Sequence, residues 1–236
     1  MRAAGAVVRL VLEAMRRAVR PGVTTVELDE IGASVMQGLG ARSAPALVYQ
    51  FPAANCISVN EEAVHGIPGR RVLQSGDLVK LDVTIEKNGF MADAAITVPV
   101  GEVTDERRRL AECAERAFKK AMLAARAGFR VSEIGRIIER EVRRSGFAVI
   151  RELGGHGIGR TIHEAPYVPN YADPHANQVL TEGLVITVEP IIAAGTGEAV
   201  VAEDGWTVLT ADRRPSAHHE HTLVITKGEP MLLTAA

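Results

Sequence analysis

Apolar residues recur at helical spacing in four segments, and each segment has recognisable start and stop signals. In the first segment Arg16, Arg17 and Arg20 lie at the C-terminal end, where they complement the helix dipole. The expected helices are residues 2–19, ended by Pro21-Gly22; a helix capped by Thr24 or Thr25 and ended near Gly38 or Gly40; a helix from Thr104 to about Ala127, ended by Gly128; and a helix capped by Ser132 that ends before Gly146.

Short apolar runs between these segments predict strands. Residues 41–56 are rich in Ala and Pro with little periodicity, so we expect a loop that leads into a strand over residues 56–59. Residues 60–69 form a turn-rich stretch that contains His65. Asn88-Gly89 is the strongest two-residue hairpin signal in the chain, because both residues tolerate the positive φ that a type I′ turn needs.

The hairpin carries two acids in a largely apolar setting. With Asn88-Gly89 as its loop, the ladder places Thr84 opposite Asp93, and Asp82 diagonal to Asp93 on the same face. Buried carboxylates that lie this close repel, so either their pKa values rise or a cation lies between them. The alternatives are an acid pair on a solvated strand face, or a one-residue bulge that moves one acid to the other face.

The chain contains an internal repeat. At an offset of 106 positions, Arg20, Gly22, Glu27, Leu28, Ile31 and Gly40 fall on Arg126, Gly128, Glu133, Ile134, Ile137 and Gly146. One residue further out of register, Gly76 matches Gly183 and Asp82 matches Glu189. A period this long is not that of a solenoid. We interpret it as two halves of one domain, and chance matching of common apolar and glycine positions is the alternative.

Composition narrows the class of protein. A chain of 236 residues can bury a sizeable core, and we expect one domain over residues 1–236. The net charge of −2 provides no basic stripe for nucleic acid, and no apolar run is long enough for a membrane span. Cys56 and Cys113 are too few for a disulfide framework and the N-terminus lacks a signal-peptide pattern, so we expect a cytoplasmic protein.

Two histidine segments bear on chemistry. Glycines surround His156 in GGHGIGR and leave its imidazole open to a ligand; no Lys followed by Ser or Thr is present, which excludes a phosphate loop. His163 lies seven residues on, without the HExxH spacing of thermolysin-type zinc sites.

A second histidine segment, SAHHEHTLVIT, alternates as a strand does. The alternation places His218, Glu220 and Thr222 on one face and His219 and His221 on the other. The alternative is a solvent-exposed strand edge, which would have the same polar pattern.

Four carboxylates and one imidazole therefore lie on or beside apolar strands: Asp82, Asp93, His156, Glu189 and Glu220. Oxygen-rich sets with one nitrogen suit pairs of Mn, Fe, Co or Zn ions, whereas structural zinc sites use cysteines. Two such ions about 3.5–4 Å apart can share a hydroxide that attacks a polarised carbonyl, as in di-metal aminopeptidases.

The motif series CISVNEEAVHGIPG, GDLVKLDVTIEKNGFMAD, GGHGIGRTIHEAP, ITVEPII and HHEHTLVIT resembles that of type I methionine aminopeptidases in order and spacing, almost from end to end. The resemblance implies the α/β (α+β) pita-bread fold, in which a central curved antiparallel sheet is covered by helices and two halves are related by a pseudo-twofold. It also implies a dinuclear metallohydrolase that removes the initiator methionine from nascent chains and peptides.

The resemblance also implies roles for individual residues. Asp82 resembles the chelating acid of one metal, Asp93 and Glu220 the bridging acids, and His156 with Glu189 the ligands of the other metal. His65 and His163 match histidines that contact substrate and help to stabilise the tetrahedral intermediate. Glu189 would also shuttle a proton to the leaving amine, and Thr84 matches a hydroxyl behind the metal ligands.

Departures from the family pattern gather in the methionine pocket. Where the family usually has tyrosines, a cysteine and a phenylalanine, this chain has Val48, Phe51, Pro45 and Ile162, while Cys56 and Trp206 match. Met91-Ala92 also replaces the usual polar pair before Asp93, and the chain begins inside what is usually the first helix, without a zinc-finger extension. Smaller side chains in the walls would widen or reshape the methionine pocket.

Three readings follow for function. The first is a metal-dependent methionine aminopeptidase, expected to be a monomer that meets nascent chains near the ribosome. The second keeps the fold but takes X-Pro peptides, as aminopeptidase P and prolidase do. The third is a non-catalytic binding protein on the same fold, for example a ribosome-associated one.

Overall fold

The computed structural model describes residues 1–235. Its helices are α1 (Arg2–Ala18), α2 (Thr25–Gly38), α3 (Ala44–Tyr49), α4 (Asp105–Ala121) and α5 (Val131–Arg144). Its strands are β1 (Arg42–Ser43), β2 (Cys56–Val59), β3 (Glu62–Val64), β4 (Leu78–Lys87), β5 (Phe90–Pro99), β6 (Ala148–Val149), β7 (Gly154–Gly157), β8 (Glu164–Pro169), β9 (Val185–Val188), β10 (Ile191–Ala193), β11 (Ala199–Val201), β12 (Val208–Thr210), β13 (Ser216–His218), β14 (Glu220–Val224) and β15 (Met231–Leu232).

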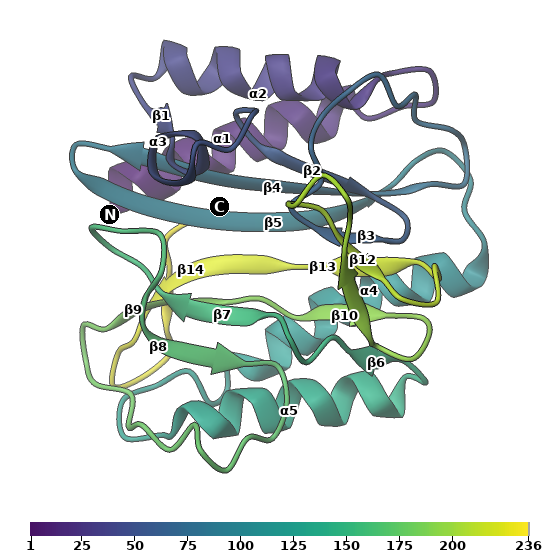
Figure 1. The fold of residues 1–236 in the computed structure, drawn as a ribbon. Coiled ribbons are helices and arrows are strands. Elements are labelled where there is room, and N and C mark those ends of the chain that lie inside the picture. The colour runs from purple at the N-terminus through teal and green to yellow at the C-terminus, as the bar shows by residue number, and fades with distance from the viewer. Residues whose placement is uncertain (236) are drawn as a thin grey trace.

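A nine-stranded sheet runs through the molecule in the order β1-β4-β5-β14-β9-β7-β8, with β2 paired to β4 and β15 paired to β14. Every pair in it is antiparallel. Two small sheets, β13-β10-β6 and β11-β12-β3, flank it. Helices α1 and α2 lie beside β4 and β5, whereas α4 and α5 lie on the side of β7 and β10 (Figure 1).

Each helix pair covers its own half of the sheet through an apolar core. Val8 and Val11 of α1 pack in one buried cluster with Val83 of β4. Leu110 of α4 packs in a second cluster with Leu223 of β14. In β4 the apolar residues face the helices, so Asp82 and Thr84 between them point to the opposite face of the sheet. No helix within residues 1–235 combines the length and apolar character that a membrane crossing requires.

The hairpin around Asn88-Gly89 is confirmed. Lys87 pairs with Phe90, and Asn88 and Gly89 have φ values of 55° and 78°. The ladder continues without a bulge from Leu78 to Lys87, and Thr84 lies opposite Asp93 as the sequence predicted. The two acids of the hairpin therefore share a face.

Matching backbone hydrogen bonds confirm the internal repeat. Gly22 N–H donates to the Leu73 carbonyl, and Gly128 N–H donates to the Leu180 carbonyl, at 2.8 and 2.9 Å. The two glycines have φ values of 93° and 90°, so each forms a left-handed turn in the loop that joins the two helices of its half. The halves thus share their helix-to-helix connection as well as their sequence pattern.

Two sequence predictions were wrong about chain segments near the site. Residues 41–56 are not only a loop, because they contain β1 and the six-residue helix α3. Ser43 caps α3 by accepting a hydrogen bond from Ala46 N–H, and Pro45 lies in its first turn. Residues 60–69 likewise contain the short strand β3.

Both helices of the second half differ at one end from the prediction. Thr104 caps α4 as expected, but α4 ends at Ala121, because Ala127 N–H donates to the carbonyl of Thr226 and draws the chain toward the sheet. The N-cap of α5 is Arg130 and not Ser132. Backbone carbonyls of a neighbouring loop accept from the first N–H groups of α5, so the helix needs no side-chain cap.

Candidate metal centre

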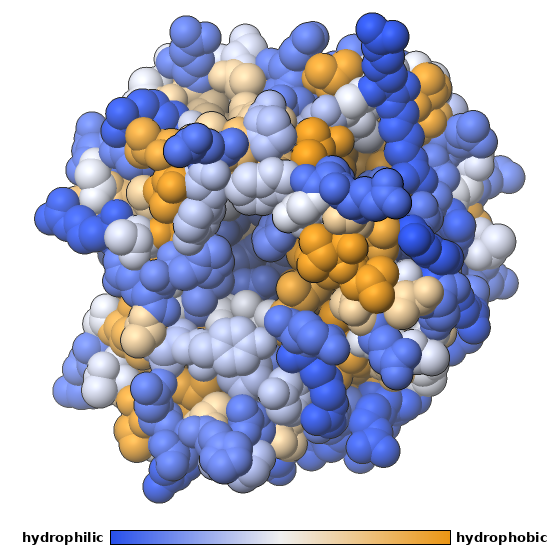
Figure 2. Space-filling model, viewed as in Figure 1, coloured by the Kyte–Doolittle hydropathy of each residue, from blue (hydrophilic) through white to orange (hydrophobic). Residues whose placement is uncertain are grey.

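A pocket of about 450 Å³ opens on the face of the sheet that the helices leave free. The surface is hollowed at its centre (Figure 2), and the walls come from both halves of the chain. Twelve of the sequence-predicted site residues line it: Phe51, Cys56, His65, Asp82, Thr84, Asp93, His156, Ile162, His163, Glu189, Trp206 and Glu220.

The sheet register explains why the acids converge. Asp82 of β4 and Glu220 of β14 are both paired with Ala95 of β5, one from each side. Asp93 lies two residues from Ala95 on the same face and is therefore diagonal to both acids. Glu189 follows β9, the next strand in the sheet. Asp93, Glu189 and Glu220 are at most 8% exposed.

Burial raises the pKa values of all four carboxyl groups, and repulsion between them adds to this effect for Asp93, Glu189 and Glu220. Burial raises the pKa of Asp82 to about 7. Burial, together with the charges of Glu220 and Asp82, raises the pKa of Asp93 well above its usual value. Burial and the nearby charge of Asp93 raise the pKa of Glu189 well above its usual value. Burial and the nearby charge of Glu189 do the same for the pKa of Glu220. A cation bound among them would remove the repulsion and favour the ionised forms.

Orphaned polar atoms show that these residues fit a metal. Within residues 1–235, Asp93 Oδ1, Glu220 Oε1 and both ring nitrogens of His218 are buried without a hydrogen-bond partner. Two triads bring ligand atoms within 4.8 Å of one another, namely Asp93, His156, Glu220 and Glu189, His218, Glu220. Carboxylate oxygens and imidazole nitrogens are the donors that first-row divalent ions bind.

His156 is held in place from β7. Its Nδ1 lies 2.9 Å from the carbonyl oxygen of Gly157, while Nε2 points into the pocket, 3.6 Å from Glu189 Oε1. The Thr187 hydroxyl accepts from His156 N–H and donates to the Glu189 carboxylate. Burial lowers the pKa of His156 to about 4, which keeps the imidazole neutral and able to bind a metal.

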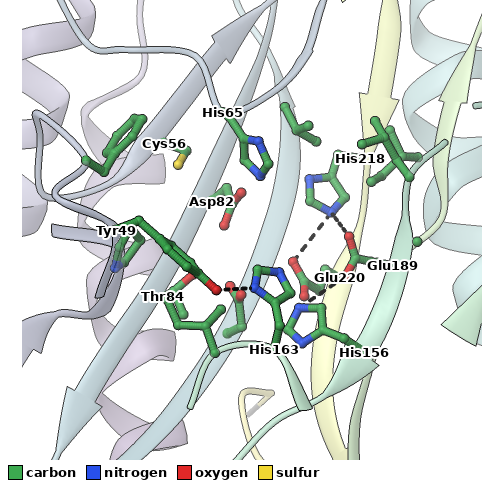
Figure 3. Close-up of a pocket in the computed structure, with 18 of the residues that line it drawn as sticks. Tyr49, Cys56, His65, Asp82, Thr84, His156, His163, Glu189, His218 and Glu220 are labelled. Atoms are coloured by element: carbon green, nitrogen blue, oxygen red, sulfur yellow. Dashed lines mark hydrogen bonds and ion pairs between the residues drawn. The ribbon is translucent and has the colours of Figure 1, made fainter. Parts of the chain in front are cut away.

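Two further histidines lie at the rim. The His163 ring centroid is 4.3 Å from that of His156, and its Nδ1 lies 2.6 Å from the hydroxyl of Tyr49 (Figure 3). His65 follows β3 and lines the pocket from the other side. Both residues are exposed, so their rings are open to a molecule in the pocket.

Apolar side chains form one wall. The rings of Phe51 and Trp206 meet edge to face with centroids 5.2 Å apart, and Cys56 and Ile162 are buried nearby. Burial raises the pKa of the Cys56 thiol well above its usual value, so the thiol stays neutral. Val48 is not one of the residues that line the pocket, and it is 39% exposed on α3; Tyr49 lines the pocket instead.

Comparison with known proteins places the chain. It matches the model for metallopeptidase family M24 over residues 1–227. The chain belongs to metallopeptidase family M24. This M24 metallopeptidase is 46% identical to methionine aminopeptidase 2 of Bacillus subtilis, over 98% of this chain and 93% of the relative. It is also 40% identical to a methionine aminopeptidase of Clostridium perfringens, over 99% of this chain and 94% of that one.

Solved structures agree with the sequence comparison. Methionine aminopeptidase from Thermotoga maritima superposes with a TM-score of 0.97 at 35% identity, over 100% of this chain and 95% of that chain. The pita-bread fold and the resemblance to methionine aminopeptidases are thereby confirmed. A prolidase from Pyrococcus horikoshii, at 23% identity, a TM-score of 0.79 and coverage of 100% of this chain and 60% of that chain, shares the fold.

Two residues that line this M24 site, Tyr49 and His218, were not among the predicted site residues. Tyr49 reaches His163 only because α3 forms, and the Ser43 and Pro45 start signals of that helix were the available clue. His218 was placed on the face of Glu220, and that alternation holds: both residues line the pocket, while His219 and His221 contact Phe118 of α4 on the other side.

Proposed function

We propose that this M24 metallopeptidase is a metal-dependent methionine aminopeptidase that removes the N-terminal methionine of peptides and nascent proteins. The observation that carries the proposal is the buried cluster of four carboxylates and an imidazole at the base of the pocket. The identity of 46% to a methionine aminopeptidase supports the substrate.

Five residues would hold two divalent ions: Asp82, Asp93, His156, Glu189 and Glu220. Asp93 is diagonal to both Asp82 and Glu220 in the sheet, and the family resemblance gives Asp93 and Glu220 the role of the bridging acids. Co, Mn, Fe and Zn all suit this donor set. Bound there, the ions supply Lewis acidity, which polarises a peptide carbonyl and lowers the pKa of water.

Residues of the chain would position and protonate the substrate. His65 and His163 lie at the rim, where their ring nitrogens can donate to the carbonyl oxygen of the scissile peptide and to the tetrahedral intermediate. Glu189 has a raised pKa, so its carboxyl group can carry a proton to the leaving amine. Thr84 lies opposite Asp93 in the ladder, and its hydroxyl would hold that carboxylate in place.

The apolar wall would take the methionine side chain. Phe51, Trp206, Cys56 and Ile162 present aromatic, thiol and aliphatic groups, which suit an unbranched thioether. Of the positions that depart from the usual family pattern, Pro45, Phe51 and Ile162 line the pocket, while Cys56 and Trp206 match the pattern. The selectivity for methionine over other unbranched side chains therefore depends on how Phe51 and Ile162 reshape the wall beside Trp206.

We also propose a setting for this activity. Nascent chains as substrate imply a cytoplasmic enzyme that acts near the ribosome, and the two cysteines, both free and buried, agree with a reducing compartment. The shared sheet of the two halves supports a single domain over residues 1–236. We expect that domain to act as a monomer, with no nucleic-acid partner at a net charge of −2.

A peptide-release assay tests the substrate and the metal together. Metal-stripped protein is reconstituted separately with Co, Mn, Fe and Zn and given Met-Ala-Ser, Leu-Ala-Ser and Ala-Pro-Ser at equal concentration. Metal-dependent release of methionine alone is the expected result. Preferential cleavage of Ala-Pro-Ser would favour an X-Pro enzyme, and no release with any ion would favour a binding protein.

A further inference from the structure

His218 is a buried histidine without a partner, aimed into the metal centre. Its side chain is 2% exposed, and neither ring nitrogen has a hydrogen-bond partner among the described residues. The residue ends β13 and lines the pocket beside Glu189 and Glu220. Its imidazole points toward both carboxylates (Figure 3). A buried histidine that serves only to fill space normally makes at least one hydrogen bond.

The distances fit shared coordination better than hydrogen bonding. His218 Nε2 lies 3.4 Å from Glu220 Oε2 and 3.8 Å from Glu189 Oε2. Both distances exceed the usual range for a nitrogen-to-oxygen hydrogen bond. Two ligand atoms bound tetrahedrally to one ion at about 2.0–2.2 Å lie roughly 3.3–3.6 Å apart. The spacing of these atoms is therefore close to that of ligands around a single ion.

The Glu189 carboxylate faces two imidazoles. Its Oε1 lies 3.6 Å from His156 Nε2, and its Oε2 lies 3.8 Å from His218 Nε2. Each imidazole belongs to a different triad, one with Asp93 and Glu220 and the other with Glu189 and Glu220. The two triads meet at Glu220, and Glu189 faces both imidazoles, so His218 lies where it could join the ion that Glu189 and Glu220 would hold.

We propose that His218 is an additional nitrogen ligand of the dinuclear centre, binding one ion together with Glu189 and Glu220. The inference rests on the proposed metal centre and extends its ligand set from five residues to six. An added imidazole shifts the preference of a carboxylate site toward Zn, Co and Fe and away from Mn. The ion held by this triad should therefore discriminate against Mn.

Proton NMR of the Co(II)-loaded protein counts the bound imidazoles directly. A histidine that binds Co(II) through Nε2 keeps an exchangeable proton on Nδ1, whose resonance is strongly shifted by the paramagnetic ion. Wild-type protein labelled with ¹⁵N-histidine should show two such resonances, from His156 and His218. His218→Gln should show one, and His219→Gln, which alters the neighbouring half-buried histidine on the opposite face, should show two.

Calorimetric titration of the metal-free proteins supplies the affinity. His218→Gln should bind one equivalent of Zn(II) and Co(II) at least about tenfold more weakly than wild type, with a smaller change for Mn(II). His219→Gln should match wild type with all three ions.

A single shifted resonance in the wild-type protein would overturn the inference without any variant, so a misfolded variant cannot hide the answer. Equal affinities and spectra in wild type and His218→Gln would also overturn it. After either outcome, methionine release by the wild-type protein would still support the proposed function. Loss of all metal binding in the wild-type protein would instead remove the proposed function itself.

Discussion

The hydroxyl of Tyr49 lies 2.6 Å from Nδ1 of His163, so helix α3 of the first half is joined across the pocket mouth to the segment that follows β7. The two rings are 5.8 Å apart at their centroids. The bond fixes the ring of His163 and directs its other nitrogen. We therefore assign Tyr49 a positioning role in substrate binding, although it does not itself reach the acids.

Replacing Tyr49 with Phe removes the hydroxyl and keeps the ring. Loss of one hydrogen bond of about 0.5–1.5 kcal/mol predicts a fall in kcat/KM for Met-Ala-Ser of roughly two- to tenfold. The melting temperature should stay near that of wild type, because Tyr49 is 44% exposed. Steady-state kinetics beside a thermal melt check this, and an unchanged kcat/KM would show that His163 does not need the bond.

Metal binding should release protons, and more of them at low pH. Burial raises the pKa of Asp82 to about 7, so metal-free protein holds a proton on this acid at pH 6 and has lost most of it at pH 8. A cation binds the ionised carboxylate and displaces that proton, so affinity should rise with pH across this range. Titration calorimetry in two buffers with different ionisation heats measures the protons released.

The Asp82→Asn variant is the control for that measurement. It should release fewer protons than wild type at pH 6 and show a flatter dependence of affinity on pH. Identical heats in the two buffers at pH 6 would mean that the acids are already ionised in the metal-free protein, contrary to the account.

The cap of α2 should contribute to stability and not to activity. Thr24 accepts from Glu27 N–H, and the Glu27 carboxylate accepts from Thr24 N–H at 2.7 Å. Thr24→Ala should lower the free energy of unfolding by about 1 kcal/mol. Ser132→Ala is the matched control: Ser132 lies at the corresponding end of α5 but does not cap it, so the change should stay within about 0.5 kcal/mol. Urea denaturation measures the free energy of unfolding of both variants. Equal losses in Thr24→Ala and Ser132→Ala would contradict the assigned caps.

Gly155 permits the close approach of β7 to Thr187. A Cβ atom at Gly155 would collide with the carbonyl oxygen of Thr187, whose hydroxyl holds both His156 and Glu189. Gly155→Ala should therefore lower stability by about 1–3 kcal/mol and weaken metal binding. Gly38→Ala, at the open end of α2, meets no atom within 4 Å and should be neutral or slightly stabilising. Full stability in Gly155→Ala would contradict this prediction, because it would mean that the backbones of β7 and Thr187 can move apart to make room for the methyl group.

Local signals explain which features the sequence could predict. Asn88-Gly89 determines its own turn, and the turn then sets the register that brings Asp82 and Asp93 to one face. The prediction that Ser132 caps α5 was wrong because the N–H groups at the start of α5 donate to carbonyls of residues more than forty positions away, Gln178 and Ala176. No local pattern reports such a contact.

The residues of the candidate site also divide into those that the sequence could predict and those that it could not. The acids lie on apolar strands or directly after one, and glycines flank His156, so the sequence could indicate all five residues, and all of them line the pocket. The partner of His163 depended on the short helix α3, and the proximity of His218 to Glu189 depended on how β13 meets the end of β9. Both are tertiary contacts between segments far apart in the chain, so their distances could not be predicted from spacing.

The most direct test of the metal-dependent mechanism is methionine release from Met-Ala-Ser by the Asp93→Asn variant, with bound metal measured on the same sample. Asp105→Asn is the control, since Asp105 is an exposed acid at the start of α4. The account predicts that wild type and Asp105→Asn release methionine and retain about two ions per chain, whereas Asp93→Asn loses an ion and falls to background. Full turnover by Asp93→Asn would contradict it.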